Sequence, residues 1–259
     1  MIKALLFDLG GTLHTVEHSR KSRLDFCTHL LRILEEHGIF LDTDAEKLNG
    51  ILAVNGEEYK HWSEKSLREL PQPEIWSRWY LREFGLAPET LAPFAEELSF
   101  YYDRERVVNT PRPRLRETLL TLHGMGIRMG VVSNIISTTL VPCVLAEYGI
   151  DGLMECVVMS SSTGIRKPDP RIFETAMQEM GITAPETGYV GDTISRDVLG
   201  AANAGLGLNI RIDNPSIAHR DAAFLGRPDA PKADFVIHEL DELPAIIRKV
   251  NGQLPHINE

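Results

Sequence analysis

Six short apolar runs alternate with helical patterns along this chain, and no other feature limits its fold as strongly. The runs cover residues 3–8, 128–133, 155–159, 188–191, 207–210 and 234–237. Between them, apolar residues at helical spacing are clearest in 115–123 and 171–180, which end near Gly124 and Gly181. Continuous apolar runs are typical of parallel strands buried on both faces. The alternation therefore predicts an α/β fold, a doubly wound parallel sheet.

One long segment, from His14 to Arg106, breaks this alternation, because it has no convincing strand pattern and several helical ones. Two of its stretches place apolar residues on one helical face: Leu24, Cys27, Leu31 and Leu34 before Gly38, and Trp76, Tyr80 and Phe84. We expect Trp76 and Trp79 to pack in a core, as aromatic residues at this spacing usually do. The sequence therefore predicts a core domain of residues 1–13 and 107–259 and an inserted helical domain of residues 14–106.

The formal net charge of −10 limits the partners of the chain. An acidic protein is repelled by nucleic-acid backbones and anionic membrane surfaces, so we expect neither as a main partner and a small-molecule ligand instead. Cys27, Cys143 and Cys156 have no paired or CxxC spacing, which disfavours a disulfide framework or a zinc site and fits a reducing compartment. No long apolar stretch marks secretion or membrane spanning. These features predict a cytoplasmic protein and leave its oligomeric state open.

Polar residues follow the apolar runs at the positions where open α/β sheets bind ligands. They are Asp8 after the first run, Ser133 and Asn134 after the second, Lys167 just before a predicted helix, and Asp192 with Asp197 after the 188–191 run. Each has a simpler explanation when taken alone. Lys167 before Pro168 can be a solvated lysine, and Asp197 in a first helical turn can serve only the helix dipole. Four coordinated positions favour a functional site over four separate coincidences.

The segments FDLGGTL, VVSN, RKPDPRIF and VGDTISRDVLGAANAG resemble, in order, the four motifs of the haloacid dehalogenase-like hydrolases. Together they span nearly the whole predicted sheet domain. The resemblance implies a Rossmann-like core, and the inserted helical domain is similar to the first class of cap found in that family. Within RKPDPRIF, Asp169 with Pro170 predicts a helix N-terminus and therefore an architectural role.

Phosphoryl transfer needs an in-line nucleophile and positive charge around the transferred group, and the motif residues can supply both. Asp8 is the predicted nucleophile, forming an aspartyl-phosphate that water later hydrolyses. Lys167 supplies one cation, while the Ser133 hydroxyl and the Asn134 backbone amide are predicted to hold phosphoryl oxygens. Mg²⁺ suits Asp8, the Gly10 carbonyl and Asp192, with Asp197 as a direct ligand or an outer partner. The chain is thus expected to be a magnesium-dependent phosphatase acting on a small phosphorylated metabolite.

Gly10 departs from the family pattern, because phosphatases that the chain resembles usually carry there a second aspartate that protonates the leaving oxygen and then activates water. General acid-base catalysis contributes roughly a hundred- to ten-thousand-fold. One possible replacement is a nearby histidine, His14 or His18, whose ordinary pKa suits proton transfer. Another is a substrate whose leaving group needs no proton, such as an acyl phosphate.

Two further alternatives stay open at this point. The chain can catalyse non-phosphatase chemistry, either carbon-halogen cleavage or phosphonate cleavage, the latter with a cap lysine as electrophile: Lys21, Lys47, Lys60 or Lys65. It can also be a binding or regulatory protein that has kept the fold and lost turnover. Retention of Asp8, Lys167 and Asp192 favours an enzyme. The aromatic and charged residues of segment 55–79 are candidates for substrate contacts.

Overall fold

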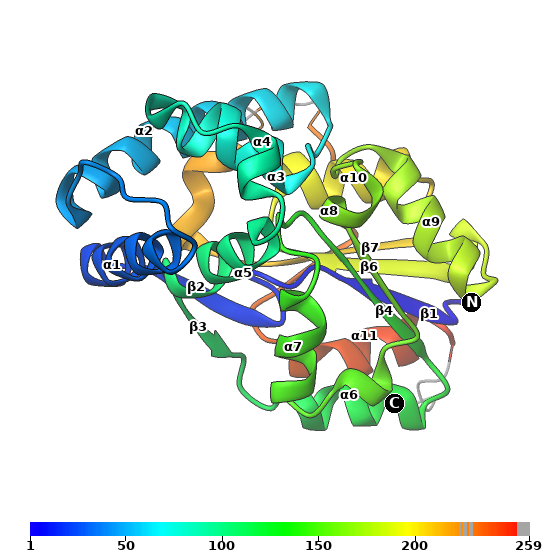
Figure 1. Cartoon of the computed structure of the whole chain (residues 1–259). Helices are drawn as coiled ribbons and strands as arrows, with labels where there is room; N and C mark the ends of the chain where they lie inside the picture. The colour runs from blue at the N-terminus through cyan, green and yellow to red at the C-terminus, as the bar shows by residue number, and fades with distance from the viewer. Residues whose placement is uncertain (223, 225–226, 228–229, 253–259) are drawn as a thin grey trace.

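The computed structural model describes residues 1–222, 224, 227 and 230–252, and its centre is a six-stranded parallel sheet (Figure 1). The strand order is β5-β4-β1-β6-β7-β8. The strands are β1 (Ala4–Phe7), β4 (Arg128–Ser133), β5 (Cys156–Met159), β6 (Thr187–Gly191), β7 (Leu208–Ile212) and β8 (Phe235–Ile237). All six apolar runs of the sequence are strands of this sheet, so the predicted α/β fold is confirmed.

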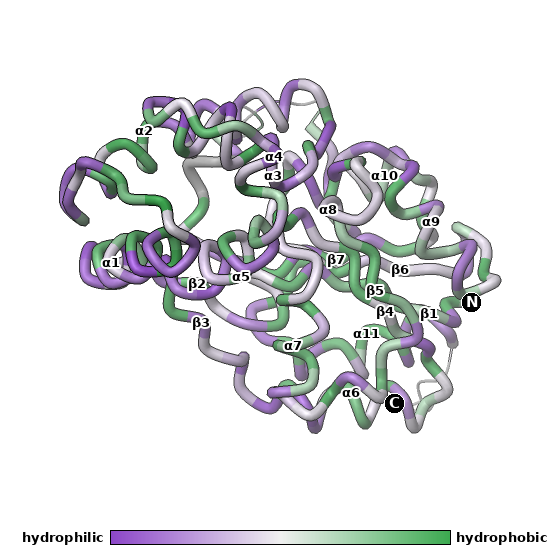
Figure 2. Tube along the Cα trace, viewed as in Figure 1, coloured by the Kyte–Doolittle hydropathy of each residue, from purple (hydrophilic) through white to green (hydrophobic). Residues whose placement is uncertain are grey.

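Helices cover both faces of the sheet, as expected for strands that are apolar on both sides. Figure 1 shows α6 (Leu115–Gly124), α7 (Leu140–Glu147) and α11 (Leu243–Val250) on one side, and α8 (Ser160–Thr163), α9 (Pro170–Met180) and α10 (Leu199–Asn203) on the other. Along β1, Leu5 and Phe7 belong to the hydrophobic cluster that contains residues of α6, α7 and α11. Ala4 and Leu6 belong to the cluster on the other face, which contains residues of α9 and α10. Figure 2 shows hydrophobic residues gathered along β4 and β5. The central sheet is therefore packed on both faces, and its strand ends are well placed to position a site.

The chain between β2 and β3 forms a helical layer over the carboxyl ends of the strands (Figure 1). Its helices are α1 (Arg20–Glu36), α2 (Ala45–Ser66), α3 (Gln72–Ile75), η1 (Trp76–Tyr80), η2 (Arg82–Phe84), α4 (Pro88–Leu91) and α5 (Ala95–Glu105). We call residues 20–105 the helical insertion. It has a hydrophobic cluster of its own, which contains Trp76 and packs against Trp79, as predicted. The Trp76 indole also donates a hydrogen bond to Ser99, so no polar atom of this buried ring is left without a partner.

The prediction that residues 14–106 contain no strand is wrong. β2 (His14–His18) pairs antiparallel with β3 (Val107–Pro111), from His14 opposite Pro111 to His18 opposite Val107. These strands lack an apolar run because they form a two-stranded ribbon that is largely exposed. Antiparallel strands with one face in solvent carry polar residues on that face. The ribbon joins the sheet to the helical insertion. The division into residues 1–13 with 107–259 and 14–106 stays a prediction, and its last seven residues, 253–259, lie outside the described part.

The remaining helical segments are η3 (Asp151–Leu153), η4 (Ala184–Glu186), η5 (Ile194–Val198), η6 (Pro215–Asp221) and η7 (Leu240–Glu242). Of these, η5 directly follows β6 and carries part of the site described below. None of the helices in the described part of the chain has the length and apolar character that crossing a membrane would need.

Candidate active site

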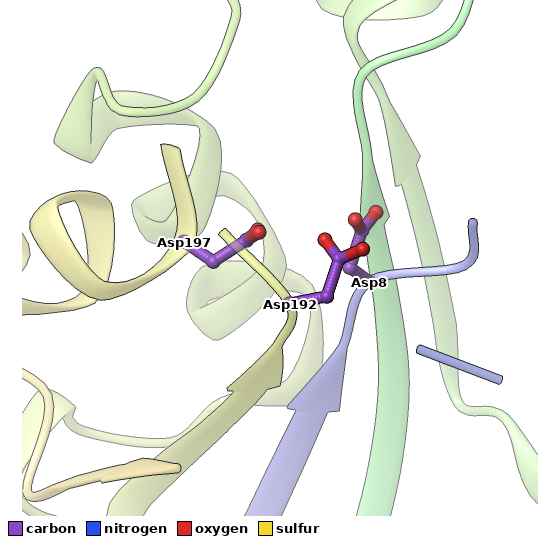
Figure 3. A group of neighbouring side chains, drawn as sticks. All are labelled: Asp8, Asp192 and Asp197. Carbon is purple, nitrogen blue, oxygen red and sulfur yellow. The ribbon is translucent and has the colours of Figure 1, made fainter. Parts of the chain in front are cut away.

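The sheet order brings the predicted nucleophile next to the other motif residues. β1 pairs with β4 on one side and with β6 on the other, so Asp8 leaves the sheet between Ser133 and Asp192. Asp8, Asp192 and Asp197 each offer a carboxylate oxygen, and these three oxygens lie within 4.8 Å of one another. Figure 3 shows the three side chains directed toward a common region from the ends of β1 and β6 and from η5. Residues far apart in the sequence thus form one acidic cluster.

Lys167 lies inside this cluster and is not a solvated lysine, since only 2% of the residue is exposed. Its ammonium is 2.9 Å from Asp8 Oδ1 and 2.7 Å from Asp197 Oδ1. It also donates a hydrogen bond to the Tyr189 hydroxyl at 2.7 Å. One buried cation therefore serves two carboxylates, and it holds the Asp8 side chain in place.

The side chain of Asn134 fixes the backbone of Lys167 from both sides of the residue. Its Nδ2 donates to the Lys167 carbonyl at 3.1 Å, and its Oδ1 accepts from the Lys167 backbone amide at 2.9 Å. The Asn134 side chain is therefore engaged with the protein, which leaves only its backbone amide for the substrate contact predicted from the sequence.

Asp197 does more than complement a helix dipole, because both of its carboxylate oxygens are engaged. Oδ1 accepts hydrogen bonds from Lys167 and from the Tyr189 hydroxyl, the latter at 3.0 Å. Oδ2 accepts from the backbone amide and the hydroxyl of Thr193. By contrast, Asp192 Oδ2 accepts one hydrogen bond from Asn214 at 2.8 Å, and its buried Oδ1 has no hydrogen-bond partner among the described residues. An unsatisfied buried carboxylate oxygen beside two further carboxylates is a donor set that suits a hard cation such as Mg²⁺.

The cluster carries more negative than positive charge, and this excess affects the pKa values of its carboxylates. Burial, followed by the charges of Asp197 and Asp8, raises the pKa of Asp192 to about 7. Burial also raises the pKa of Asp8, against the opposing effect of Lys167. For Asp197 burial acts in the same direction, but Lys167 and Arg196 outweigh it and lower the pKa to about 2. Three carboxylates near the two cations Lys167 and Arg196 leave a net negative charge, which favours a further cation at this position.

A sequence model of the haloacid dehalogenase-like hydrolases matches residues 2–205. The chain belongs to this family. Two similar proteins are glyceraldehyde 3-phosphate phosphatases: that of Methanopyrus kandleri is 29% identical over 250 residues, and that of Methanocaldococcus jannaschii is 25% identical over 259 residues. Each alignment covers 96% of this chain and 99% of the relative. A crystal structure of 2-haloacid dehalogenase from Pseudomonas syringae pv. tomato DC3000 is 22% identical, covers 96% of this chain and 100% of its own, and has a TM-score of 0.62, which shows the shared fold alone. The protein is therefore a hydrolase of the phosphatase-like kind.

Two adjacent glycines of this haloacid dehalogenase-like hydrolase differ in whether the structure would accept a side chain at their position. Gly11 has a φ of +84°, and a Cβ there would lie 1.8 Å from Asp192 Oδ2, so a side chain would displace a carboxylate of the cluster. Gly10 has no positive φ, and its Cβ would meet only Val16 Cγ2 at 3.6 Å and His14 Nε2 at 3.9 Å, which are ordinary contacts. Position 11 therefore requires glycine, whereas position 10 has room for the first atom of a side chain.

Of the two histidines considered as proton carriers, His14 lies beside Gly10 and His18 lies at the exposed far end of β2. His14 is buried, and its Nδ1 is 3.1 Å from the Tyr148 hydroxyl. Burial lowers the pKa of His14 to about 4, so the imidazole is neutral at pH 7. Its Nε2 is the ring atom that faces the place where a side chain on Gly10 would begin.

A cavity of about 360 Å³ opens beside Lys167 and lies between the core and the helical insertion. The core contributes Lys167, Pro168, Ser195 and Arg196, and the insertion contributes Glu57, Lys60, His61, Glu64 and Leu67. Of the four lysines considered as electrophiles, Lys60 lines this cavity, and it forms an ion pair with Glu57 at 2.7 Å. Lys21 and Lys47 instead pair with Asp25 and Asp44 on the exposed surface.

Three residues that support the site were not predicted. Tyr189 connects Lys167 to Asp197, Asn214 holds Asp192, and Asp221 accepts hydrogen bonds from the backbone amides of Ile194 at 2.8 Å and Ser195 at 3.0 Å. Tyr189 is part of an apolar strand and gives no separate signal there. Asn214 and Asp221 lie in a segment without periodic pattern, where polar residues are expected whatever their role.

Proposed function

We propose that this protein is a magnesium-dependent phosphatase of small phosphorylated metabolites that works through an aspartyl-phosphate at Asp8. The observation that carries the proposal is the buried contact of Lys167 with Asp8 beside the partner-free oxygen of Asp192. A carboxylate fixed by a buried lysine and surrounded by further carboxylates fits a nucleophile that must approach an anionic phosphate. The names of the two archaeal relatives support phosphomonoester hydrolysis and favour a triose phosphate among the first substrates to test.

In the proposed reaction, a carboxylate oxygen of Asp8 attacks phosphorus, the bond from phosphorus to the leaving oxygen breaks, and the leaving group of an alkyl ester takes its proton from water. Lys167 keeps the Asp8 oxygen oriented, and the Ser133 hydroxyl and the Asn134 backbone amide hold phosphoryl oxygens. Water then attacks phosphorus of the acyl phosphate, which releases inorganic phosphate and restores the Asp8 carboxylate. These residues account for nucleophilic attack and phosphate binding without a side chain at Gly10.

The residues that would hold Mg²⁺ are Asp8, the Gly10 carbonyl and Asp192. When bound, the ion neutralises carboxylate charge and polarises the phosphoryl group. Asp197 fits an outer partner better than a direct ligand, because both of its oxygens already accept hydrogen bonds from Lys167, Tyr189 and Thr193. Its proposed task is to fix Lys167.

We assign residues 14–106 to a cap that closes over the site, since the helical insertion supplies five residues of the cavity wall. Phosphonate cleavage receives no support from the cavity, because its one candidate lysine, Lys60, is already paired with Glu57. We propose a cytoplasmic location, which the spacing of the three cysteines supports.

Two measurements test the proposal. The first is a screen of phosphorylated metabolites with saturating Mg²⁺, followed by omission of the metal, and release of inorganic phosphate in the first condition only is expected. The second is a rapid-quench experiment with a ³²P-labelled substrate found in the screen, with mass spectrometry to locate the label. Label on Asp8 is expected; label elsewhere, or a complete lack of turnover across the screen, would contradict the proposal.

A further inference from the structure

Arg196 is a second cation of the cavity, and none of the roles assigned so far uses it. It lies on η5 between Asp192 and Asp197 and lines the cavity together with Lys167. The turn that carries it is fixed, because Asp221 accepts hydrogen bonds from the two preceding backbone amides, those of Ile194 and Ser195. The backbone that carries Arg196 at the cavity wall is therefore anchored by hydrogen bonds.

The charge of Arg196 is not matched by an ion pair with any residue that the structure describes. An arginine side chain stays charged over the whole ordinary pH range, so Arg196 brings a permanent positive charge to the cavity. The three carboxylates of the acidic cluster act on Arg196 at a distance, and two of them already contact Lys167. Glu64 of the helical insertion lines the same cavity and forms no ion pair with Arg196. A half-buried cation without a contact partner is costly unless a ligand supplies one.

The cavity continues from Arg196 toward one face of α2. Glu57, Lys60, His61 and Glu64 have the spacing of neighbours on a single helical face, and all four line the cavity. Lys60 and His61 are both near Glu57, at 2.7 Å and 3.6 Å, so this wall is polar, and its second carboxylate, Glu64, forms no ion pair with the described residues. Arg196 is therefore a cation that lines this cavity without an ion pair to any described residue, whereas Lys60 and Lys167 are both paired.

We infer that Arg196 binds a carboxylate on the part of the substrate that is not transferred, so that the preferred substrates are small phosphorylated carboxylic acids. The inference rests on the proposed phosphatase function. A planar guanidinium matches a carboxylate with two parallel hydrogen bonds, which an uncharged hydroxyl or aldehyde cannot reproduce. The volume of about 360 Å³ suits a ligand of a few carbon atoms and is at the small end of known ligand sites.

The test compares two substrates that differ mainly in this group, 3-phosphoglycerate and glycerol 3-phosphate. The wild-type enzyme is expected to have the higher kcat/KM for 3-phosphoglycerate. Arg196→Gln should raise the KM for 3-phosphoglycerate by about ten- to a hundredfold, as expected for loss of a charge-assisted hydrogen-bonded pair, and should change glycerol 3-phosphate hydrolysis by less than about threefold. Arg196→Lys keeps the charge without the planar fork and should fall between the two. Arg32→Gln, which removes an exposed arginine of the helical insertion, is the matched control and should change the hydrolysis of neither substrate.

Calorimetry keeps the inference separate from the phosphatase proposal. Both esters are titrated with Mg²⁺ present into Asp8→Asn and into Asp8→Asn with Arg196→Gln, which bind without turnover. Tighter binding of 3-phosphoglycerate that disappears with Arg196 supports the inference, even if the wild-type protein hydrolyses neither ester, in which case only the phosphatase proposal fails. Equal losses for both esters would overturn the inference, since Arg196 would then serve the shared phosphate or the acidic cluster. Equal binding of both esters by the protein that retains Arg196 would overturn it as well.

Discussion

Restoring a carboxylate at position 10 is the most informative single change that the structure suggests. The backbone allows it, because Gly10 lacks a positive φ and the nearest atoms to its Cβ would be Val16 Cγ2 at 3.6 Å and His14 Nε2 at 3.9 Å. A carboxylate on that Cβ would start between the end of β1 and the ribbon strand β2. We predict that Gly10→Asp folds normally and gains activity on substrates whose leaving group needs a proton.

The size of the gain follows from what is available without the substitution. General acid-base catalysis is worth roughly 10²- to 10⁴-fold, or about 3 to 5 kcal/mol of activation free energy. With its pKa near 4, His14 is protonated in about one molecule in a thousand at pH 7, so it is a poor acid for this step. An alkyl ester such as glycerol 3-phosphate should therefore gain at least about tenfold in kcat, whereas acetyl phosphate, whose leaving carboxylate needs no proton, should gain less than about threefold.

The assay measures phosphate release from both substrates by wild type, Gly10→Asp and Gly10→Asn at saturating Mg²⁺. Gly10→Asn is the matched control, because it adds the same volume without a titratable group. Circular dichroism and thermal melts check that all three proteins fold. If a well-folded Gly10→Asp protein shows no selective gain on the alkyl ester, or if Gly10→Asn gains as much, the missing acid is not what limits this enzyme. A large further loss in His14→Gln would then identify the histidine as the group that already transfers the proton.

Three other predictions test the site and its surroundings. Asp8→Asn should reduce kcat by at least about a thousandfold and leave the melting temperature unchanged, since the amide keeps the shape and loses the nucleophile; activity near the wild-type level would refute the role of Asp8. Asp192→Ala should weaken Mg²⁺ binding by at least about tenfold in calorimetry, and an unchanged affinity would exclude Asp192 as a ligand. Burial raises the pKa of Asp103 from 3.8 to about 7, so between these values the folded protein keeps a proton that the unfolded chain loses, and stability falls as pH rises. Urea unfolding at pH 5 and pH 8 should show a smaller decrease for Asp103→Asn than for wild type, and identical decreases would contradict the shift.

The strands of the sheet were predictable because burial on both faces leaves a direct mark on the sequence. Residues 129–132 (MGVV) are an unbroken apolar run in the sequence, and residues 128–133 are β4 in the structure. The ribbon strand β2 has no such mark, since HTVEH is mostly polar and its pairing with β3 is fixed by residues about 90 positions away. Local patterns report burial, and a strand that is half exposed is visible only through its partner.

The site residues were predictable for a similar reason, which is that each follows a strand whose neighbours the topology determines. Asp8 and Asp192 meet because β1 and β6 are adjacent. The contact of Tyr189 with Lys167 was not predictable, because a tyrosine in an apolar strand indicates packing and says nothing of where its hydroxyl points. The nearness of His14 to Gly10 was suspected from sequence separation alone, and the ribbon explains it, since residues 10 and 14 form a bridge at the start of β2.

The contacts between the helical insertion and the core show most clearly what sequence patterns miss. Glu96 of α5 accepts hydrogen bonds from the backbone amides of Thr138 and Thr139, and Asp103 accepts from those of Ile136 and Ser137. Each acid would pass for a solvated residue on the polar face of a helix. Their shared target is the loop that begins just after Ser133 and Asn134.

A third acidic residue of the insertion, Glu69, contacts the core next to Lys167. Glu69 forms a buried ion pair with Arg166, the residue before Lys167, and also accepts hydrogen bonds from Ser160 and Tyr59. The insertion thus holds the two loops that carry Asn134 and Lys167, and Asn134 in turn holds the Lys167 backbone. Breaking such contacts would leave buried charges and backbone amides without partners, at a cost of about 1 to 3 kcal/mol for each unsatisfied group. Because these groups lie next to Lys167, the contacts between the insertion and the core also help to place Lys167 in the candidate site.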